Sequence, residues 1–187
     1  MSASILTNCG VGRLAKTERF YWDACAWLGL LNKESAKHRE LEIVWKRAEN
    51  GDCEILTSAL SQVEVFKKKC EGTDPKPLSV EADADISDLF KQPHVIPAQL
   101  DPIIAEAARA LLRAHPELKK APDAIHLATA LFHNCDAMHT YDSDNLIGLS
   151  EMVKCRNGRP LEICIPDASV DGPLFSGRKD ISERETK

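Results

Sequence analysis

The chain has 187 residues, of which 43% are hydrophobic, so it is long enough to enclose one sizeable core. Its formal net charge of −5 neither supports nor excludes a nucleic-acid partner, because a cluster of five acids around a cation would leave the remainder neutral. The longest apolar stretch near the start, Ala24 to Leu31, is far shorter than the roughly 20 residues of a membrane-spanning helix.

The remaining global features predict a cytoplasmic protein without a membrane segment. Residues 1–18 lack the basic opening and apolar run of a secretory signal, and their small polar residues predict a flexible leader. The seven cysteines form no C-x-x-C pair, so they are interpreted as small hydrophobic side chains rather than a zinc site or a disulfide framework.

The first elements combine an aromatic strand with two helices. Arg19 to Trp22 predicts a strand, and Asp23 follows at its end, where the apolar helix Ala24 to Leu31 begins. Ser35 to Asn50 has apolar residues at i, i+3, i+4 and i+7, which predicts an amphipathic helix.

The middle of the chain alternates strands and helices. A strand is predicted over Cys53 to Thr57, and a helix over Ser58 to Cys70 contains Glu64 and ends in Lys67 to Lys69. After the linker Gly72 to Pro77, we predict these elements in order: a charged helix over 79–91, a strand over Val95 to Ala98, and a helix over Asp101 to Ala114 with an Asp cap and Pro102 at its first position.

The last part continues the alternation. The predicted elements are a helix from Pro122 to Asn134, a strand over Ala137 to Tyr141, a helix over about Asp144 to Val153, and a strand over Leu161 to Ile165. Residues 167–187 are polar and form a tail that we expect to be disordered, most clearly beyond Gly177.

This alternation predicts a three-layer α/β/α sandwich with a central, mostly parallel sheet, formed by residues 19–166 as one domain. In such sheets ligands bind beyond the carboxyl ends of the strands. Asp23 and Asp142 both fall at such ends, on two different strands. The sequence therefore places a candidate site at this edge of the sheet.

Two further acids, Glu64 and Asp123, also interrupt apolar or structural patterns. Carboxylates brought within about 4 Å would repel each other by about 4 kcal/mol at an effective dielectric near 20, so a cluster would require protons or a cation. An all-oxygen ligand set suits Mg²⁺ or Mn²⁺, which can activate water and neutralise phosphate charge. The sequence leaves open whether one or two ions bind.

Each acid also has a purely structural interpretation. Asp23 can cap the helix that follows it, and Glu64 can form a capping box with Ser61. Asp123 can complement a helix dipole, whereas Asp142 and Asp144 can bind their own backbone in turns.

Taken together, four sequence blocks resemble the PIN domain family, in particular the bacterial VapC-like toxins. The resemblance rests on YWDACAWLGLL, TSALSQVEVF and PDAIHLATAL, and on the T-x-D pattern that ends at Asp142, nineteen residues after Asp123; it covers about residues 19 to 165. It implies a metal-dependent nuclease in which the acids hold the catalytic ion, with Asp144 as a less constant ligand and Thr140 orienting a carboxylate or water. The proposed metal ligands are Asp23, Glu64, Asp123, Asp142 and, more weakly, Asp144.

The resemblance further implies an RNA substrate, a cognate antitoxin and a tendency to dimerise. Weak candidates for RNA contact are Lys67, Lys68, Arg156 and Arg159, although such charges usually form a solvated surface. The histidines match no metal-binding motif and are interpreted as structural, with His126 as a group that could support Asp123. Two alternatives stay open, namely a non-catalytic PIN-fold interaction or scaffold module and a housekeeping PIN nuclease.

Overall fold

A computed structural model describes residues 16–73 and 77–167. Its centre is a five-stranded sheet in the order β3-β2-β1-β4-β5, in which every neighbouring pair is parallel. The strands are β1 (Glu18–Trp22), β2 (Cys53–Ser58), β3 (Val95–Ala98), β4 (Ala137–His139) and β5 (Glu162–Cys164). All described strands therefore present their carboxyl ends at one edge of the sheet.

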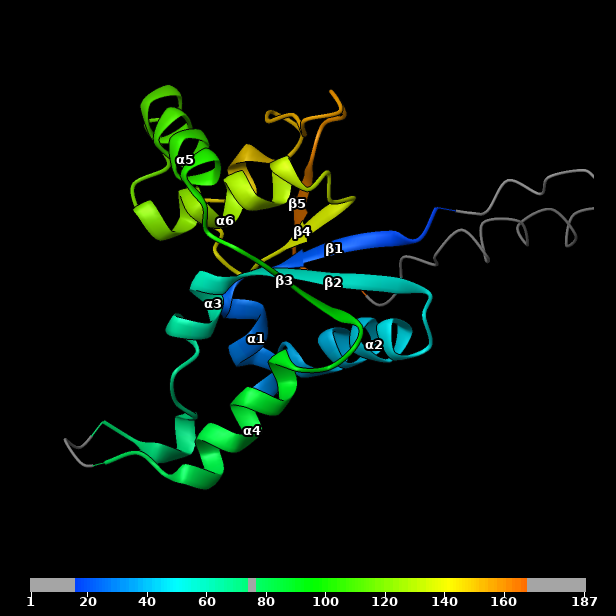
Figure 1. The fold of residues 1–187 in the computed structure, drawn as a ribbon, viewed down its shortest axis with the longest axis vertical. Helices are drawn as coiled ribbons and strands as arrows, with labels where there is room; N and C mark the ends of the chain where they lie inside the picture. Colours follow the sequence, from blue (N-terminus) through cyan, green and yellow to red (C-terminus); the bar gives the residue numbers. More distant parts are fainter. Residues whose placement is uncertain (1–15, 74–76, 168–187) are drawn as a thin grey trace, which may run out of the picture.

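Helices cover both faces of this sheet. They are α1 (Ala24–Leu31), α2 (His38–Glu49), α3 (Ala59–Glu64), α4 (Val80–Phe90), α5 (Pro102–Ala114) and α6 (Ala121–Phe132), with short 3-10 turns at Lys69–Glu71 and Ile147–Leu149. Figure 1 shows α5 and α6 on one face and α1, α2 and α4 on the other. The predicted three-layer sandwich is confirmed, and the sheet is parallel throughout.

The alternation of side chains along β1 builds two hydrophobic cores. Phe20 and Trp22 lie in the core beneath α1, α2 and α4, whereas Tyr21 lies in the core beneath α5 and α6. Ile55 and Leu56 of β2 divide between the two cores in the same way. The strand that ends at Asp23 is thus anchored on both faces, which fixes the position of that carboxylate.

Helix boundaries follow the predicted signals where capping residues act. The predicted helix Ala24 to Leu31 has the bounds of α1, and Asp101 caps α5 by accepting a hydrogen bond from the Ile104 amide at 2.9 Å, with Pro102 in the first position. The predicted helix Ser35 to Asn50 begins three residues later, at His38.

One predicted helix is too long and another is wrong. The helix predicted over Ser58 to Cys70 ends at Glu64, because the next residue, Val65, turns its side chain into the core and is 1% exposed. The helix predicted over Asp144 to Val153 is replaced by turns and the single 3-10 turn Ile147–Leu149. Here Asn145 is bound to Asp142, so the chain starts as a side-chain-stabilised turn rather than as a helix.

The ends of the chain are described only in part. The strand β1 begins at Glu18, one residue before the predicted start of the strand at Arg19. Most of the predicted leader and tail lies outside the described residues. Within the described ranges, no helix has the length and apolar character needed to cross a membrane. Of the described cysteines, Cys53, Cys135 and Cys155 are buried, whereas Cys70 is exposed.

Candidate metal site

Asp23 is the most buried of the candidate acids, with 3% of its surface exposed. It caps α1, since its Oδ1 accepts a hydrogen bond from the Ala26 amide at 3.0 Å. Its Oδ2 accepts a hydrogen bond from the Thr140 hydroxyl at 2.5 Å, and the same hydroxyl accepts one from the Asp142 amide at 3.1 Å. Burial raises the pKa of Asp23, with the Thr140 contact opposing the shift. Thr140 therefore links two acids that follow different strands.

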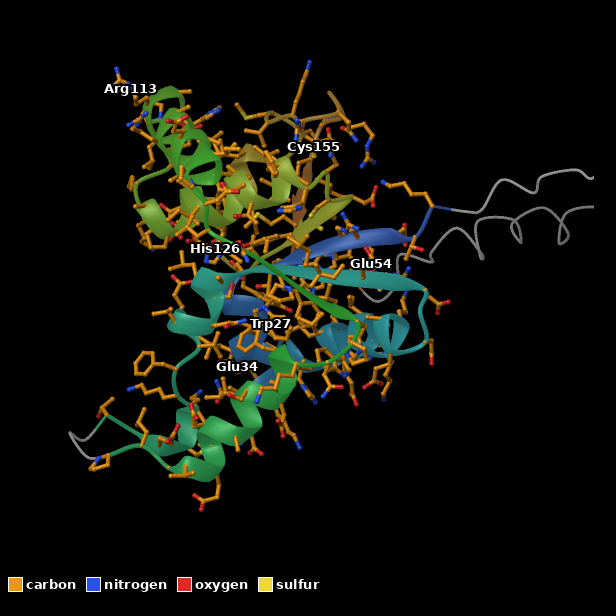
Figure 2. All side chains as sticks on the ribbon, viewed as in Figure 1. Trp27, Glu34, Glu54, Arg113, His126 and Cys155 are labelled. Atoms are coloured by element: carbon orange, nitrogen blue, oxygen red, sulfur yellow. The ribbon has the colours of Figure 1, made fainter. Side chains whose placement is uncertain are left out.

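Glu64 is the last residue of α3, and its carboxylate contacts a buried histidine. Its Oε2 lies 2.7 Å from His126 Nε2, and His126 Nδ1 lies 2.7 Å from the Tyr21 hydroxyl. The capping box with Ser61 is wrong as an interpretation of Glu64, because the residue that caps α3 is Ser58. Figure 2 places His126 where the carboxyl edge of the sheet meets α3 and α6.

Asp123 lies in the first turn of α6 and has an unusual environment. Its Oδ2 is buried and has no hydrogen-bond partner in the structure. Burial raises the pKa of Asp123, and the negative charges of Asp142 and Glu64 add to the shift, whereas Lys120 opposes it. A buried carboxylate oxygen without a donor is unfavourable unless a proton or a cation supplies the missing contact.

Asp142 follows β4 and is held by its own loop. Its Oδ1 accepts hydrogen bonds from the amides of Asp144 and Asn145, each at 3.1 Å, and Asn145 Nδ2 donates to Oδ2 at 2.9 Å. Burial would raise the pKa of Asp142, but these hydrogen bonds and the nearby Lys120 lower it overall. Asp144 itself is exposed, and its Oδ1 lies 3.4 Å from the Ser143 hydroxyl.

The four main acids are electrostatic neighbours without forming a closed ligand cage. The negative charges of Glu64 and Asp142 both raise the pKa of Asp123. Burial, together with the charges of Asp23, Asp142 and Asp123, raises the pKa of the Cys25 thiol to about 12. Yet within residues 16–73 and 77–167, no three His, Cys, Asp or Glu side chains form a group that could hold a metal ion. The structure gathers the acids at one edge, with their oxygens bound mainly to protein donors.

Three neighbours of the acids were not among the predicted site residues. Lys120 Nζ lies 3.9 Å from Asp142 Oδ2 and is 62% exposed, and no sequence pattern pointed to it. For Asn145, the only sequence signal of a contact with Asp142 was its position three residues further along the chain. Tyr21 could have been found, because the alternation of β1 buries its hydroxyl, and a buried hydroxyl needs a partner.

The predicted RNA-contact residues are already engaged elsewhere. Lys67 Nζ donates to the Gly72 carbonyl at 3.2 Å, and Lys68 forms an ion pair with Asp85.

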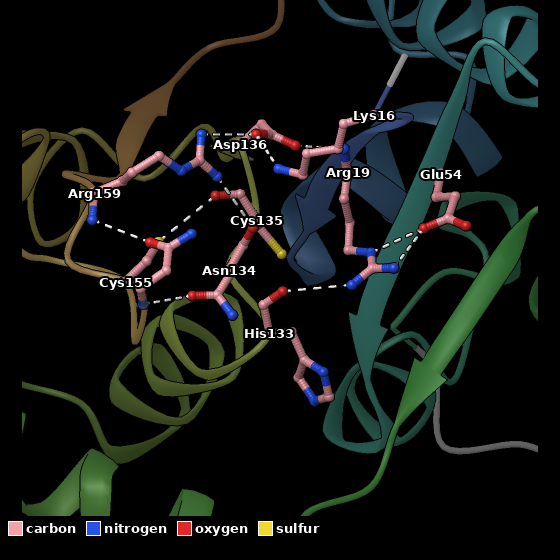
Figure 3. Close-up of polar contacts among 10 residues, drawn as sticks. Lys16, Arg19, Glu54, His133, Asn134, Cys135, Asp136, Cys155 and Arg159 are labelled. Carbon is pink, nitrogen blue, oxygen red and sulfur yellow. Dashed lines mark hydrogen bonds and ion pairs between the residues drawn. The ribbon is translucent and has the colours of Figure 1, made fainter. Parts of the chain in front are cut away.

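At the opposite, amino edge of the sheet, Arg159 contacts Asp136 at 2.8 Å, in the charged network of Figure 3. Arg156 lies with its guanidinium 5.0 Å from the centre of the Phe132 ring. Neither arginine contacts the four acids.

Comparison with known proteins identifies the family of this fold. The model of the PIN domain family matches residues 20–149, which span all four acids. The chain belongs to the PIN domain family. A search of curated proteins gives no match.

Among solved structures the fold is similar to VapC toxins. One is VapC20 of Mycobacterium tuberculosis, a toxin that cleaves the sarcin-ricin loop; it shares 17% identity, with a TM-score of 0.53, over 67% of this chain and 91% of that chain. Another is VapBC2 of Rickettsia felis bound to a DNA fragment from its promoter, at 13% identity and a TM-score of 0.52 over 80% of this chain and 99% of that chain. At these identities the likeness establishes the VapC-like fold.

Proposed function

We propose that this chain is a metal-dependent endoribonuclease that hydrolyses RNA phosphodiester bonds in the cytoplasm. We further propose that it is the toxin of a type II toxin-antitoxin pair. The observation that carries the proposal is the buried, unpartnered Oδ2 of Asp123, which lies within electrostatic reach of Glu64 and Asp142. A hard divalent cation is the ligand that would satisfy this oxygen and make the neighbouring charges tolerable.

The donor set fits Mg²⁺ or Mn²⁺ in its chemistry. Asp23, Glu64, Asp123 and Asp142 offer carboxylate oxygens only, which these ions prefer to the nitrogen and sulfur ligands typical of zinc. A carboxylate oxygen that accepts one hydrogen bond keeps further acceptor capacity, so the contacts to Asn145 and His126 do not exclude metal binding. Asp144 is exposed nearby and is proposed as a weaker ligand.

When bound, such an ion supplies Lewis-acid chemistry, activating water and neutralising charge on the phosphate. The protein groups prepare the site. Thr140 holds the Asp23 carboxylate, and Asn145 holds that of Asp142, so both keep their positions as substrate approaches. Lys120, exposed beside Asp142, is proposed to contact an RNA phosphate.

The choice of RNA and of an antitoxin partner is supported by the VapC-like fold. VapC20 is a toxin that cleaves the sarcin-ricin loop, and VapBC2 is a toxin-antitoxin pair. Growth arrest on expression, relieved by co-expression of a small partner protein and abolished by Asp123→Asn, would support the toxin assignment. Growth that is unaffected while RNA is cleaved in vitro would favour the housekeeping nuclease.

The test of the nuclease itself is RNA cleavage in Mn²⁺ with and without a chelator. We expect Asp123→Asn to reduce the Mn²⁺-dependent rate by at least about 100-fold, because it removes the charge that the ion compensates. Asp88→Asn, the same change at an exposed position of α4, is the matched control and should retain the rate. Full activity of the Asp123→Asn variant would overturn the assignment.

One observation favours the alternative of a non-catalytic PIN-fold interaction module. In the part of the chain that the structure describes, no three potential ligands form a metal-binding group. Calorimetry with Mn²⁺ separates the two functions, since the nuclease must bind the ion and a scaffold need not. Absence of Mn²⁺ binding by the wild-type chain would favour the module.

A further inference from the structure

The Glu64 carboxylate ends a chain of contacts that starts in the sheet. The Ser58 amide donates to the Tyr21 hydroxyl at 3.2 Å, this hydroxyl lies 2.7 Å from His126 Nδ1, and His126 Nε2 lies 2.7 Å from Glu64 Oε2. Tyr21 is fully buried and His126 is 3% exposed, whereas the Glu64 side chain is 29% exposed. Figure 2 shows His126 between α6 and the end of the sheet.

The positions of the hydrogens follow from the contacts. Tyr21 is fully buried, and its phenol hydroxyl can donate one hydrogen bond while it accepts another. The Tyr21 oxygen accepts from the Ser58 amide, and its own hydrogen is then directed to His126 Nδ1. A neutral ring that accepts at Nδ1 carries its hydrogen on Nε2, which faces Glu64 Oε2.

We propose that Tyr21 and His126 are positioning residues that hold the Glu64 carboxylate toward the acid set through the Nε2–H tautomer of His126. The proposal rests on the proposed function, in which Glu64 is a metal ligand. A partly exposed glutamate at the end of a six-residue helix has several rotamers, and ordering it costs conformational entropy. A short hydrogen bond from a buried ring selects one rotamer in advance and leaves Oε1 for the ion.

The tautomer is tested first, in the metal-free protein. Nitrogen NMR of the histidine rings should show His126 protonated at Nε2 and unprotonated at Nδ1. Tyr21→Phe should shift the Nδ1 resonance, because it removes the hydrogen bond donated to Nδ1, while the Glu64 carboxylate still keeps the ring hydrogen on Nε2. A wild-type ring protonated at Nδ1, or an Nδ1 resonance unchanged in Tyr21→Phe, would overturn the relay.

The effect on Glu64 is tested with two matched variants of His126. Gln carries an amide nitrogen near the position of Nε2, whereas Asn reaches only the position of Nδ1; both remove the ring from a buried site. By calorimetry we expect His126→Asn to weaken Mn²⁺ affinity about 10- to 100-fold, and His126→Gln to lose no more than about threefold. Excess Mn²⁺ should restore the RNA-cleavage kcat of His126→Asn, which general misfolding would not allow.

The possible results separate this inference from the proposed function. Mn²⁺ binding by the wild type with equal affinities in wild type and His126→Asn overturns the positioning role and leaves the nuclease standing. Equal weakening in the Asn and Gln variants, without recovery in excess Mn²⁺, also overturns it, because the loss then reflects packing. Failure of the wild type to bind Mn²⁺ removes the proposed function, and the ring NMR then decides the relay by itself.

Discussion

Asp136 and Asp123 lie at opposite edges of the sheet and have opposite electrostatic environments. At the amino edge, Asp136 accepts hydrogen bonds from Lys16 and from the Arg19 amide, each at 2.9 Å, and pairs with Arg159 at 2.8 Å, while Arg19 pairs with Glu54 at 2.7 Å (Figure 3). Burial opposes ionisation there, but these partners lower the pKa of Asp136 overall. Asp136 and Glu54 at this edge are therefore both paired with cationic side chains.

At the carboxyl edge Asp142 also has a lowered pKa, but the balance is reversed at Asp123. Asp123 has a raised pKa and a buried oxygen without a donor, and the cation acting on it, Lys120, is largely exposed. A carboxylate surrounded by hydrogen-bond donors stabilises the folded state. A buried carboxylate without donors lowers the free energy of unfolding, and a bound cation can offset this loss. The amino edge joins β1 to the residue before β4 through the contact of Arg19 with Asp136, and the proposed cation would bind at the carboxyl edge.

The largest expected difference is the response to metal. At a Mn²⁺ concentration 100 times its Kd, the wild type should gain about 2.7 kcal/mol in free energy of unfolding. Asp136→Asn should gain as much, whereas Asp123→Asn should gain little. Urea denaturation with and without Mn²⁺ measures this, and equal gains in all three proteins would remove the distinction between the edges.

The next effect concerns stability without metal at pH 7. Asp136→Asn should lower the free energy of unfolding by about 1–2 kcal/mol, because it weakens a network of charged hydrogen bonds at a half-buried carboxylate. Asp123→Asn should leave the free energy unchanged or raise it. Urea unfolding in chelator checks both variants, and a larger loss in Asp123→Asn than in Asp136→Asn would contradict the comparison.

The pH dependence sharpens the same contrast. The raised pKa of Asp123 means that its ionisation disfavours the fold, so wild type should lose stability relative to Asp123→Asn as pH rises from about 4 toward the folded pKa. The lowered pKa of Asp136 has the opposite sign, and the deficit of Asp136→Asn should shrink as pH falls below about 4. Metal-free unfolding at pH 3 to 7 would show slopes of opposite sign.

The smallest expected effect is on RNA affinity. Arg159→Met should change the RNA Kd by less than about twofold, since Arg159 is paired at the amino edge, whereas Lys120→Met should weaken binding several-fold at low salt. Titration of catalytically inactive protein with RNA measures both. A reversed order would move the RNA path to the other edge.

The sequence predicted the elements whose signals are local. Asp23 ends an aromatic strand, and Asp101 with Pro102 opens α5, and these signals need no tertiary information. The strand pattern placed Asp23 and Asp142 after the carboxyl ends of two strands, where they lie in the structure. The metal roles of Asp23, Glu64, Asp123 and Asp142 stay predictions.

The failures have two causes: a local turn stabilised by side chains, and contacts between distant parts of the chain. Leu146, Leu149 and Val153 have helical spacing and are buried, but turns fixed by Asn145 bury them without a helix. Lys120 is recognised only in the fold, where it lies beside Asp142, since no motif names its partner, whereas the burial of Tyr21 follows from the alternation of β1. The spacing of apolar residues predicts which side chains are buried. It does not always predict the backbone conformation that buries them.

The brevity of α3 has a consequence for how this chain can vary in length. Glu64 is the sixth and last residue of the helix, and the buried Val65 follows at once. One residue inserted between Ser58 and Glu64 would rotate the acid by about 100° and advance it by about 1.5 Å, breaking its alignment with His126. Insertions beyond Gly72, in the segment that leads to α4, would impose no such rotation.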